Sequence, residues 1–195
     1  LPTTLRLPAR KFAFRLTHRF SRPLDGGPTY QNLLEDFFGF DSPAAISLEL
    51  RFGLMPGTQI GVQRGNNQGL QIFGRQSFLS ERNGRALGLD AIISIEGLNN
   101  FREEYSPVVG LILSKLLRER AAFYVEPTWV GNTNKPGAFH VRIPASVTDD
   151  ATFMVGLGTR FRVRPTVYVA AEYVPRVSGL DIGRDLVTFA LEKRV

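Results

Sequence analysis

The stretch Ala44-Ala-Ile-Ser-Leu-Glu-Leu-Arg-Phe-Gly-Leu54 alternates between apolar and polar or small residues from position 46 onward. Successive side chains of a β-strand point to opposite faces, so this pattern predicts a strand with one apolar face and one polar face. The apolar set is Ile46, Leu48, Leu50, Phe52 and Leu54, and the polar set is Ser47, Glu49, Arg51 and Gly53. The stretch has about the length, ~9–11 residues, that a tilted strand needs to cross a bilayer.

The same alternation recurs along the chain and predicts about ten strands in one β-barrel domain over residues 1–195. Besides the first stretch, the predicted strands are Lys11–Phe20, Thr58–Arg64, Leu70–Leu79, Leu87–Gly97, Val108–Leu116, Phe123–Trp129, Phe153–Val163, Val167–Tyr173 and Leu186–Arg194. One segment differs, because Tyr30, Leu33, Leu34, Phe37 and Phe38 have helical spacing. We therefore expect one short helix, 30–38, in the first long loop.

Composition excludes several classes of protein. Charged residues make up 22% of the chain and no apolar run approaches ~20 residues, which excludes a helical membrane protein. The absence of cysteine excludes disulfides and thiolate metal sites. The net charge of +6 comes mostly from arginines that are scattered through the strands rather than gathered in one patch, which argues against nucleic acid as a partner.

Connection lengths indicate which kind of barrel this is. Tight links are predicted at Met55–Gly57, Ser80–Arg85, Arg118–Arg120 and Arg164–Pro165. Longer links alternate with them, at Ser21–Pro43, Leu98–Ser106, Gly131–Asp150 and Arg176–Asp185, with a modest exception at Gly65–Gly69. Membrane barrels have short periplasmic turns at one rim and longer external loops at the other. The sequence thus predicts an antiparallel up-and-down transmembrane β-barrel of about 10–12 strands in the bacterial outer membrane, in contact with lipid.

Aromatic residues on the apolar face fall near the strand ends, as in the interfacial girdles of membrane barrels. Near the rim with short turns we expect Phe12, Phe52, Phe123 and Phe161, and near the other rim Phe20, Trp129 and Tyr173. Ordinary core aromatics at strand ends are the alternative.

The polar face carries nearly balanced charges in mid-strand, which predicts ion pairs between strands inside a lumen. These residues are Arg15, Arg19, Glu49, Arg51, Asp90, Glu96, Glu126, Arg160, Arg162 and Glu172. Glycines on the same face leave room for long side chains. The alternative is a randomly charged, solvated outer surface.

Three short motifs resemble a family of uncharacterised bacterial outer-membrane-type β-barrel proteins, classed as a domain of unknown function. They are Arg15-Leu-Thr-His-Arg-Phe20, Phe38-Gly-Phe-Asp41 and Ala171-Glu-Tyr-Val-Pro175, in that order along most of the chain. The resemblance implies a membrane barrel but brings no activity and no site residues. It also implies a further hairpin after residue 194, so we expect the barrel to be incomplete at the C-terminal end or to close differently.

Candidates for catalysis are weak. His140 has Ser146 and Asp149 or Asp150 near it only within one loop, and His18 has the parity of the apolar face. Acidic pairs at Glu103-Glu104 and Asp149-Asp150 suggest a cation site less well than ordinary loop composition does. We expect no catalytic residue, metal or cofactor.

The expected function is that of a scaffold or docking barrel, or a narrow pore, without catalysis. Two alternatives remain at this point. One is a soluble or peripheral β-barrel that binds an apolar ligand. The other is a subunit of an envelope complex, bound to its partners through the external loops and the helix 30–38.

Overall fold

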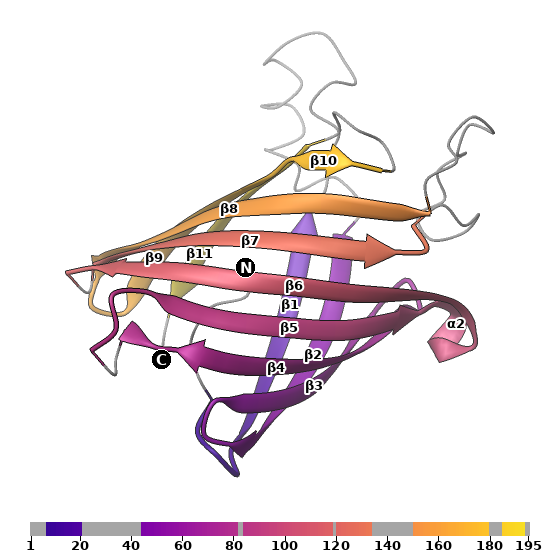
Figure 1. Cartoon of the computed structure of the whole chain (residues 1–195), viewed down its shortest axis with the longest axis horizontal. Helices are drawn as coiled ribbons and strands as arrows, with labels where there is room; N and C mark the ends of the chain where they lie inside the picture. The colour runs from indigo at the N-terminus through magenta and orange to yellow at the C-terminus, as the bar shows by residue number, and fades with distance from the viewer. Residues whose placement is uncertain are drawn as a thin grey trace, which may run out of the picture.

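The chain forms one antiparallel sheet in a computed structural model that describes residues 7–20, 44–81, 84–118, 120–133, 150–179 and 185–193 (Figure 1). Ten strands follow one another across the sheet in the order β1-β2-β3-β4-β5-β6-β7-β8-β9-β11, and β10 pairs with β8. Their bounds are β1 Phe12–Phe20, β2 Ala44–Met55, β3 Thr58–Gly65, β4 Leu70–Leu79, β5 Gly88–Gly97, β6 Glu103–Leu117, β7 Ala121–Gly131, β8 Ala151–Arg164, β9 Val167–Val174, β10 Arg176–Ser178 and β11 Leu186–Lys193.

The structure contains a strand at each of the predicted positions. These strands form because alternating residues give each one an apolar and a polar face, and because short hairpin connections bring neighbours together. Each strand pairs with the next one along the chain, which keeps apolar residues in register on one face and polar residues on the other. Thus Phe14 opposes Leu50, whereas Arg15 opposes Glu49. At the β2–β3 turn, Gly57 has φ +87°, a conformation that glycine adopts without strain, and its carbonyl accepts a hydrogen bond from Ser77 N–H at 2.8 Å.

The connections lie at two rims, as the alternation of their lengths predicted. The short-turn rim holds the β2–β3, β4–β5, β6–β7 and β8–β9 links, and the opposite rim holds the others. One expected long loop, Leu98–Ser106, is wrong. Strand β6 begins at Glu103 and pairs Tyr105 with Gly97, so only the single turn α2 (Leu98–Phe101) and Arg102 connect it to β5. Just after the expected loop, Pro107 is accommodated in the ladder opposite Ile95.

The expected link Arg176–Asp185 is likewise shorter than predicted. Strand β10 continues the path of β9 along β8, with Met154 opposite Arg176 just as Leu157 is opposite Tyr173. Pro175 separates the two strands because it lacks the N–H that a ladder requires. Its carbonyl still accepts a hydrogen bond from Val155 N–H at 3.3 Å.

The sheet curls, with β4–β7 in front and β1, β2 and β11 behind them in Figure 1. Strands β1 and β11 form its two edges, and the described residues contain no pairing between them. The expected helix 30–38 lies outside the described residues, so the structure does not test it. No helix in the described part of the chain has the length and apolar character needed to cross a bilayer.

Candidate functional site on the inner face of the sheet

The two faces of the sheet differ sharply in exposure. On the outer face, apolar side chains are open to the surroundings: Ile93 is 62% exposed and Phe123 is 48% exposed. On the inner face, the neighbouring Asp90 is 1% exposed and Tyr124 is 4% exposed. This is the reverse of a ligand-binding barrel with an apolar interior. The alternative of a barrel that holds an apolar ligand inside is therefore wrong for the face that this sheet encloses.

A first ion-pair cluster lies on the inner face of β1 and β2. Arg15 Nη2 contacts Glu49 Oε2 at 2.5 Å, and Arg51 Nε contacts Glu49 Oε1 at 2.7 Å. Arg15 and Glu49 are direct partners in the strand register, and Arg51 follows two positions along the same strand. The Glu49 side chain is buried, so both of its oxygens are used by cations rather than by water. The pairing predicted between strands is found here.

A second cluster lies deeper, between β4 and β5. Arg75 donates from Nε to Asp90 Oδ2 at 2.8 Å and also from Nη2, while Ser77 Oγ donates to Asp90 Oδ1. Arg75 and Asp90 are both buried. The sequence analysis identified Asp90 but missed Arg75, because Phe73 and Gly74 break the simple alternation of Leu70–Leu79. Counting forward from Gln71 in steps of two residues, through Phe73, would have found Arg75.

The other half of the inner face is rich in carboxylates and glycines. Glu126 opposes Gly156 and Glu172 opposes Gly158, so a strip without side chains separates the two acids. The Glu126 side chain is buried, and its Oε1 has no hydrogen-bond partner within the described ranges. The expectation that Glu126 pairs with an arginine across the lumen is therefore not met by a contact, although the charges of Glu172 and Arg75 act on it.

The remaining predicted residues vary in their contacts. The Arg160 guanidinium stacks over the Tyr168 ring, with Cζ 3.7 Å from the centroid. Glu96 and Arg162 are partly buried on the inner face, and the side chain of Arg19 lies outside the described residues. Bulky groups also occupy this face. Tyr124 was placed there by alternation, whereas Ile112 and Phe73 were missed. The Phe73 ring lies where a side chain at Gly61 would be.

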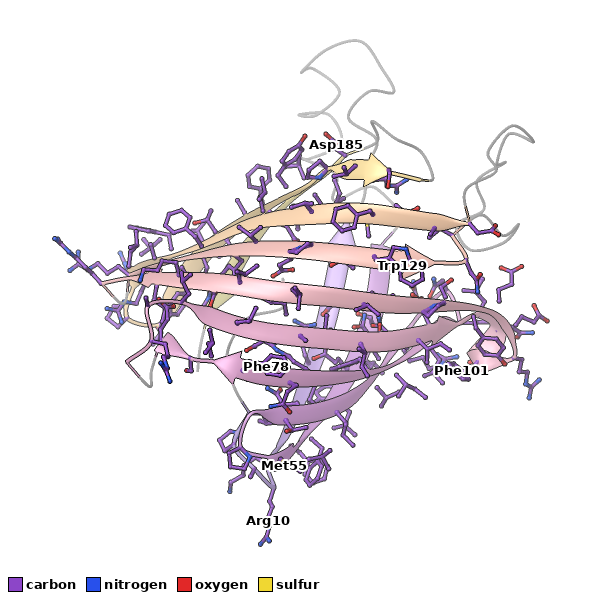
Figure 2. The ribbon with its side chains drawn as sticks, viewed as in Figure 1. Arg10, Met55, Phe78, Phe101, Trp129 and Asp185 are labelled. Atoms are coloured by element: carbon purple, nitrogen blue, oxygen red, sulfur yellow. The ribbon has the colours of Figure 1, made fainter. Side chains whose placement is uncertain are left out.

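The expected girdle residues lie on the outer face wherever their side chains are described. Phe12 packs on Phe52 with ring centroids 4.6 Å apart, near the short-turn rim. Figure 2 shows Trp129 toward the end of the sheet that carries Phe101, and Arg10 beside Met55 at the short-turn rim. Phe123, Phe161 and Tyr173 are also exposed, and the side chain of Phe20 is not described.

Catalytic and metal chemistry have little support in the described part of the chain. The side chain of His18, the whole of His140 and Ser146, and Asp149 lie outside it. Among the described residues, no group of three His, Cys, Asp or Glu side chains is placed to hold a metal ion. This face buries charge, and in its two ion-pair clusters arginines neutralise Glu49 and Asp90 where water is displaced.

An antiparallel meander with an apolar outer face and a charged inner face defines the class of membrane β-barrels. Residues 1–192 match the family described as a membrane bound beta barrel domain, DUF5777, and the chain belongs to that family of unknown function. Contact with the lipid bilayer follows from this membership. No curated protein and no solved structure matches the chain significantly.

Proposed function

We propose that this protein is a β-barrel of about 10–12 strands in the bacterial outer membrane that acts as a non-catalytic scaffold or docking barrel and conducts, at most, through a narrow gap. The two longest connections, 21–43 and 132–150, lie at the same rim, and this supports the outer membrane, where the rim with short turns faces the periplasm. The longer connections, with the expected helix 30–38, are the candidates for contact with partner subunits of an envelope complex.

Closure between β1 and β11 is the first part of this proposal. An even number of strands in the meander makes the two edge strands antiparallel, which permits direct pairing. Their outer residues are among the most exposed apolar side chains of the sheet, with Phe14 at 69%, Phe189 at 78% and Leu191 at 77%. Unpaired edges of this kind are liabilities, and in a bilayer each free N–H or C=O costs several kcal/mol.

The register of closure follows from keeping each face continuous. Odd-numbered residues of β1 and even-numbered residues of β11 share the inner face, as their partners Glu49 and Glu172 show. The pairing that uses the whole of β11 and respects this parity sets Phe12 opposite Lys193, and hence Phe14 opposite Leu191. We define this contact as the β1–β11 seam.

The filled inner face is the observation that carries the functional proposal. Ile112, Tyr124, Arg75 and Asp90 are all buried there, and they come from four different strands. In a barrel of about eight strands the interior is just wide enough to be filled by side chains, and ten strands widen it only moderately. A general diffusion pore is therefore not expected.

Planar-bilayer recording of the reconstituted protein tests the proposal. We expect silence or small events from the native chain. Truncation by Phe73→Ala with Tyr124→Ala should introduce a measurable conductance, because it empties the inner face. The matched control is Phe123→Ala, on the outer face of β7 next to Tyr124, and it should leave the recording unchanged. Large, steady conductance of the native protein would rule out the scaffold interpretation.

A further inference from the structure

The short-turn rim has a strongly basic character in the described residues. Its exposed cations are Arg10, Lys11, Arg85, Arg118, Arg120 and Arg164. The carboxylate of Glu81 also lies at this rim, where it pairs with Lys115. The opposite rim carries exposed carboxylates at Glu103, Asp150 and Asp185 together with arginines. A basic rim beside an apolar belt has the chemistry to hold anionic groups at the surface of a bilayer.

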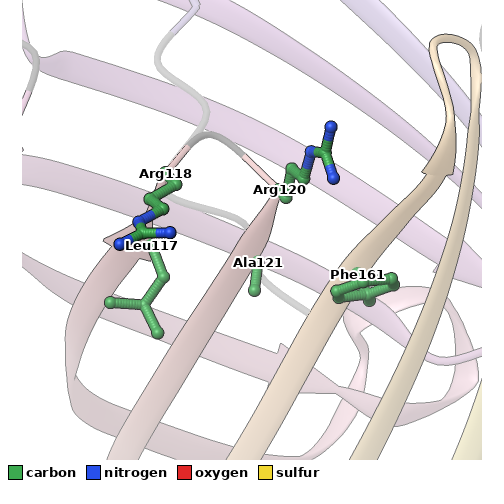
Figure 3. Close-up of a pocket in the computed structure, with 5 residues that line it drawn as sticks. All are labelled: Leu117, Arg118, Arg120, Ala121 and Phe161. Atoms are coloured by element: carbon green, nitrogen blue, oxygen red, sulfur yellow. The ribbon is translucent and has the colours of Figure 1, made fainter.

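One pocket lies at this rim, at the β6–β7 turn. It is lined by Leu117, Arg118, Arg120, Ala121 and Phe161, and its volume is about 630 Å³ (Figure 3). Leu117 opposes Ala121, and Ala121 opposes Phe161, so the small alanine lies between two large exposed side chains. These three residues form a notch on the outer face that is open toward the lipid.

The two arginines lie at the rim end of this notch. Figure 3 shows Arg118 beside Leu117 and Arg120 on the other side of the turn. Arg120 is anchored by its backbone, because its N–H donates to Leu117 O at 3.0 Å and its carbonyl accepts from Arg162 N–H at 2.7 Å. Both guanidinium groups are exposed, and Glu119 between them in the sequence lies outside the described residues.

Arg118 has a backbone conformation that does not suit it. Its φ is +46°, in the left-handed region that glycine and asparagine tolerate better than arginine does. The β6–β7 turn thus holds Arg118 in this less favourable conformation at the rim end of the notch.

We propose that the β6–β7 turn binds an anionic phospholipid of the leaflet at the short-turn rim. Arg118 and Arg120 hold the headgroup phosphate, and an acyl chain lies in the notch formed by Leu117, Ala121 and Phe161. Charge complementarity selects an anionic headgroup, and the apolar notch selects a lipid over a free anion. This inference rests on the proposed orientation of the barrel in the membrane, although not on its being closed to ions.

Native mass spectrometry of the full chain in detergent micelles, titrated with phosphatidylglycerol, tests the site. Arg118→Asn should weaken binding about fivefold, the effect of one basic residue near an anionic surface. Since asparagine tolerates a positive φ, the fold should be retained. Arg102→Asn, which removes the same charge at the opposite rim, is the matched control and should change binding little. Arg120→Gln provides a second variant whose backbone contacts are unchanged.

Two comparison ligands identify what is bound. Phosphatidylcholine should bind more weakly than phosphatidylglycerol, and inorganic phosphate alone should not displace the lipid. Equal binding of the two lipids, equal losses in Arg118→Asn and Arg102→Asn, or displacement by phosphate would each overturn the lipid site. None of these results would affect the conductance test, and a conducting native barrel would leave the lipid measurement standing.

Discussion

Replacing Asp90 with asparagine removes a buried anion of the inner face while keeping the shape of the side chain. Asp90 is 1% exposed and accepts hydrogen bonds from Arg75 and from Ser77. The Arg75 side chain is buried with it, so a guanidinium loses its counter-charge in a place where little water can replace it. Removing one partner of a buried ion pair costs roughly 3–5 kcal/mol.

We expect Asp90→Asn to lower the free energy of unfolding by about 3 kcal/mol, toward the lower end of that range, because the asparagine oxygen still accepts one hydrogen bond. Ser77→Ala, which removes a single hydrogen bond to the same carboxylate, should cost about 1 kcal/mol. The double variant Arg75→Met with Asp90→Asn should lose less free energy of unfolding than the sum of the losses in the two single variants, because the two residues interact directly.

Equilibrium unfolding in denaturant, with the protein in lipid vesicles, measures these differences. The chain has one tryptophan, Trp129, and its exposed position on the outer face makes its emission a reporter of membrane contact. A loss below about 1 kcal/mol for Asp90→Asn would mean that water solvates the charges and that the inner face is open. Additive losses in the double variant would show that Arg75 and Asp90 do not stabilise each other.

Two further predictions use the absence of native cysteine. Phe14→Cys with Leu191→Cys should form a disulfide across the β1–β11 seam on oxidation. Phe14→Cys with Phe189→Cys, which is offset by two residues, should cross-link poorly. Failure of both pairs to cross-link would exclude closure by these strands. A single cysteine in place of Ile93 should resist a water-soluble maleimide in vesicles because it faces lipid, and it should react with a membrane-permeant maleimide. A cysteine in place of Ser94 provides the comparison on the inner face. Ready labelling from water at position 93 would reverse the assignment of the two faces.

Most of the fold could be predicted from local pattern, because contact with lipid on one face and burial on the other enforce a period of two. The predicted bounds of Leu70–Leu79 are those of β4, and those of β1, β2 and β3 differ by a residue. The prediction of strand bounds failed where pairing with a neighbouring strand extends a strand into residues whose composition is typical of a loop. Strand β6 runs through Glu103, Glu104 and Pro107 because β5 offers it a ladder, which the sequence of β6 alone does not reveal.

The candidate site was predicted less completely, since charge partners depend on register between strands. Alternation placed Glu49 and Arg15 on one face, but only the register between β1 and β2 sets them directly opposite each other. The partner of Asp90 is Arg75, two positions from its direct opposite Ser77, and no local pattern indicates that diagonal. The space beside Glu126 likewise arises from glycines on β8, a strand that lies further along the chain.

The order of the strands has a consequence for how the chain reaches its native state. Every pairing from β1 to β9 joins strands adjacent in sequence, so each hairpin can form locally with a small entropic cost of loop closure. The proposed β1–β11 seam joins the first and last described strands and is by far the most distant pairing in the sequence. The hairpins have low contact order and therefore assemble fast. The seam pairs residues that are distant in sequence, so it forms slowly. Until it forms, two exposed edges remain available to other chains, so this last step is where a folding assistant would matter most.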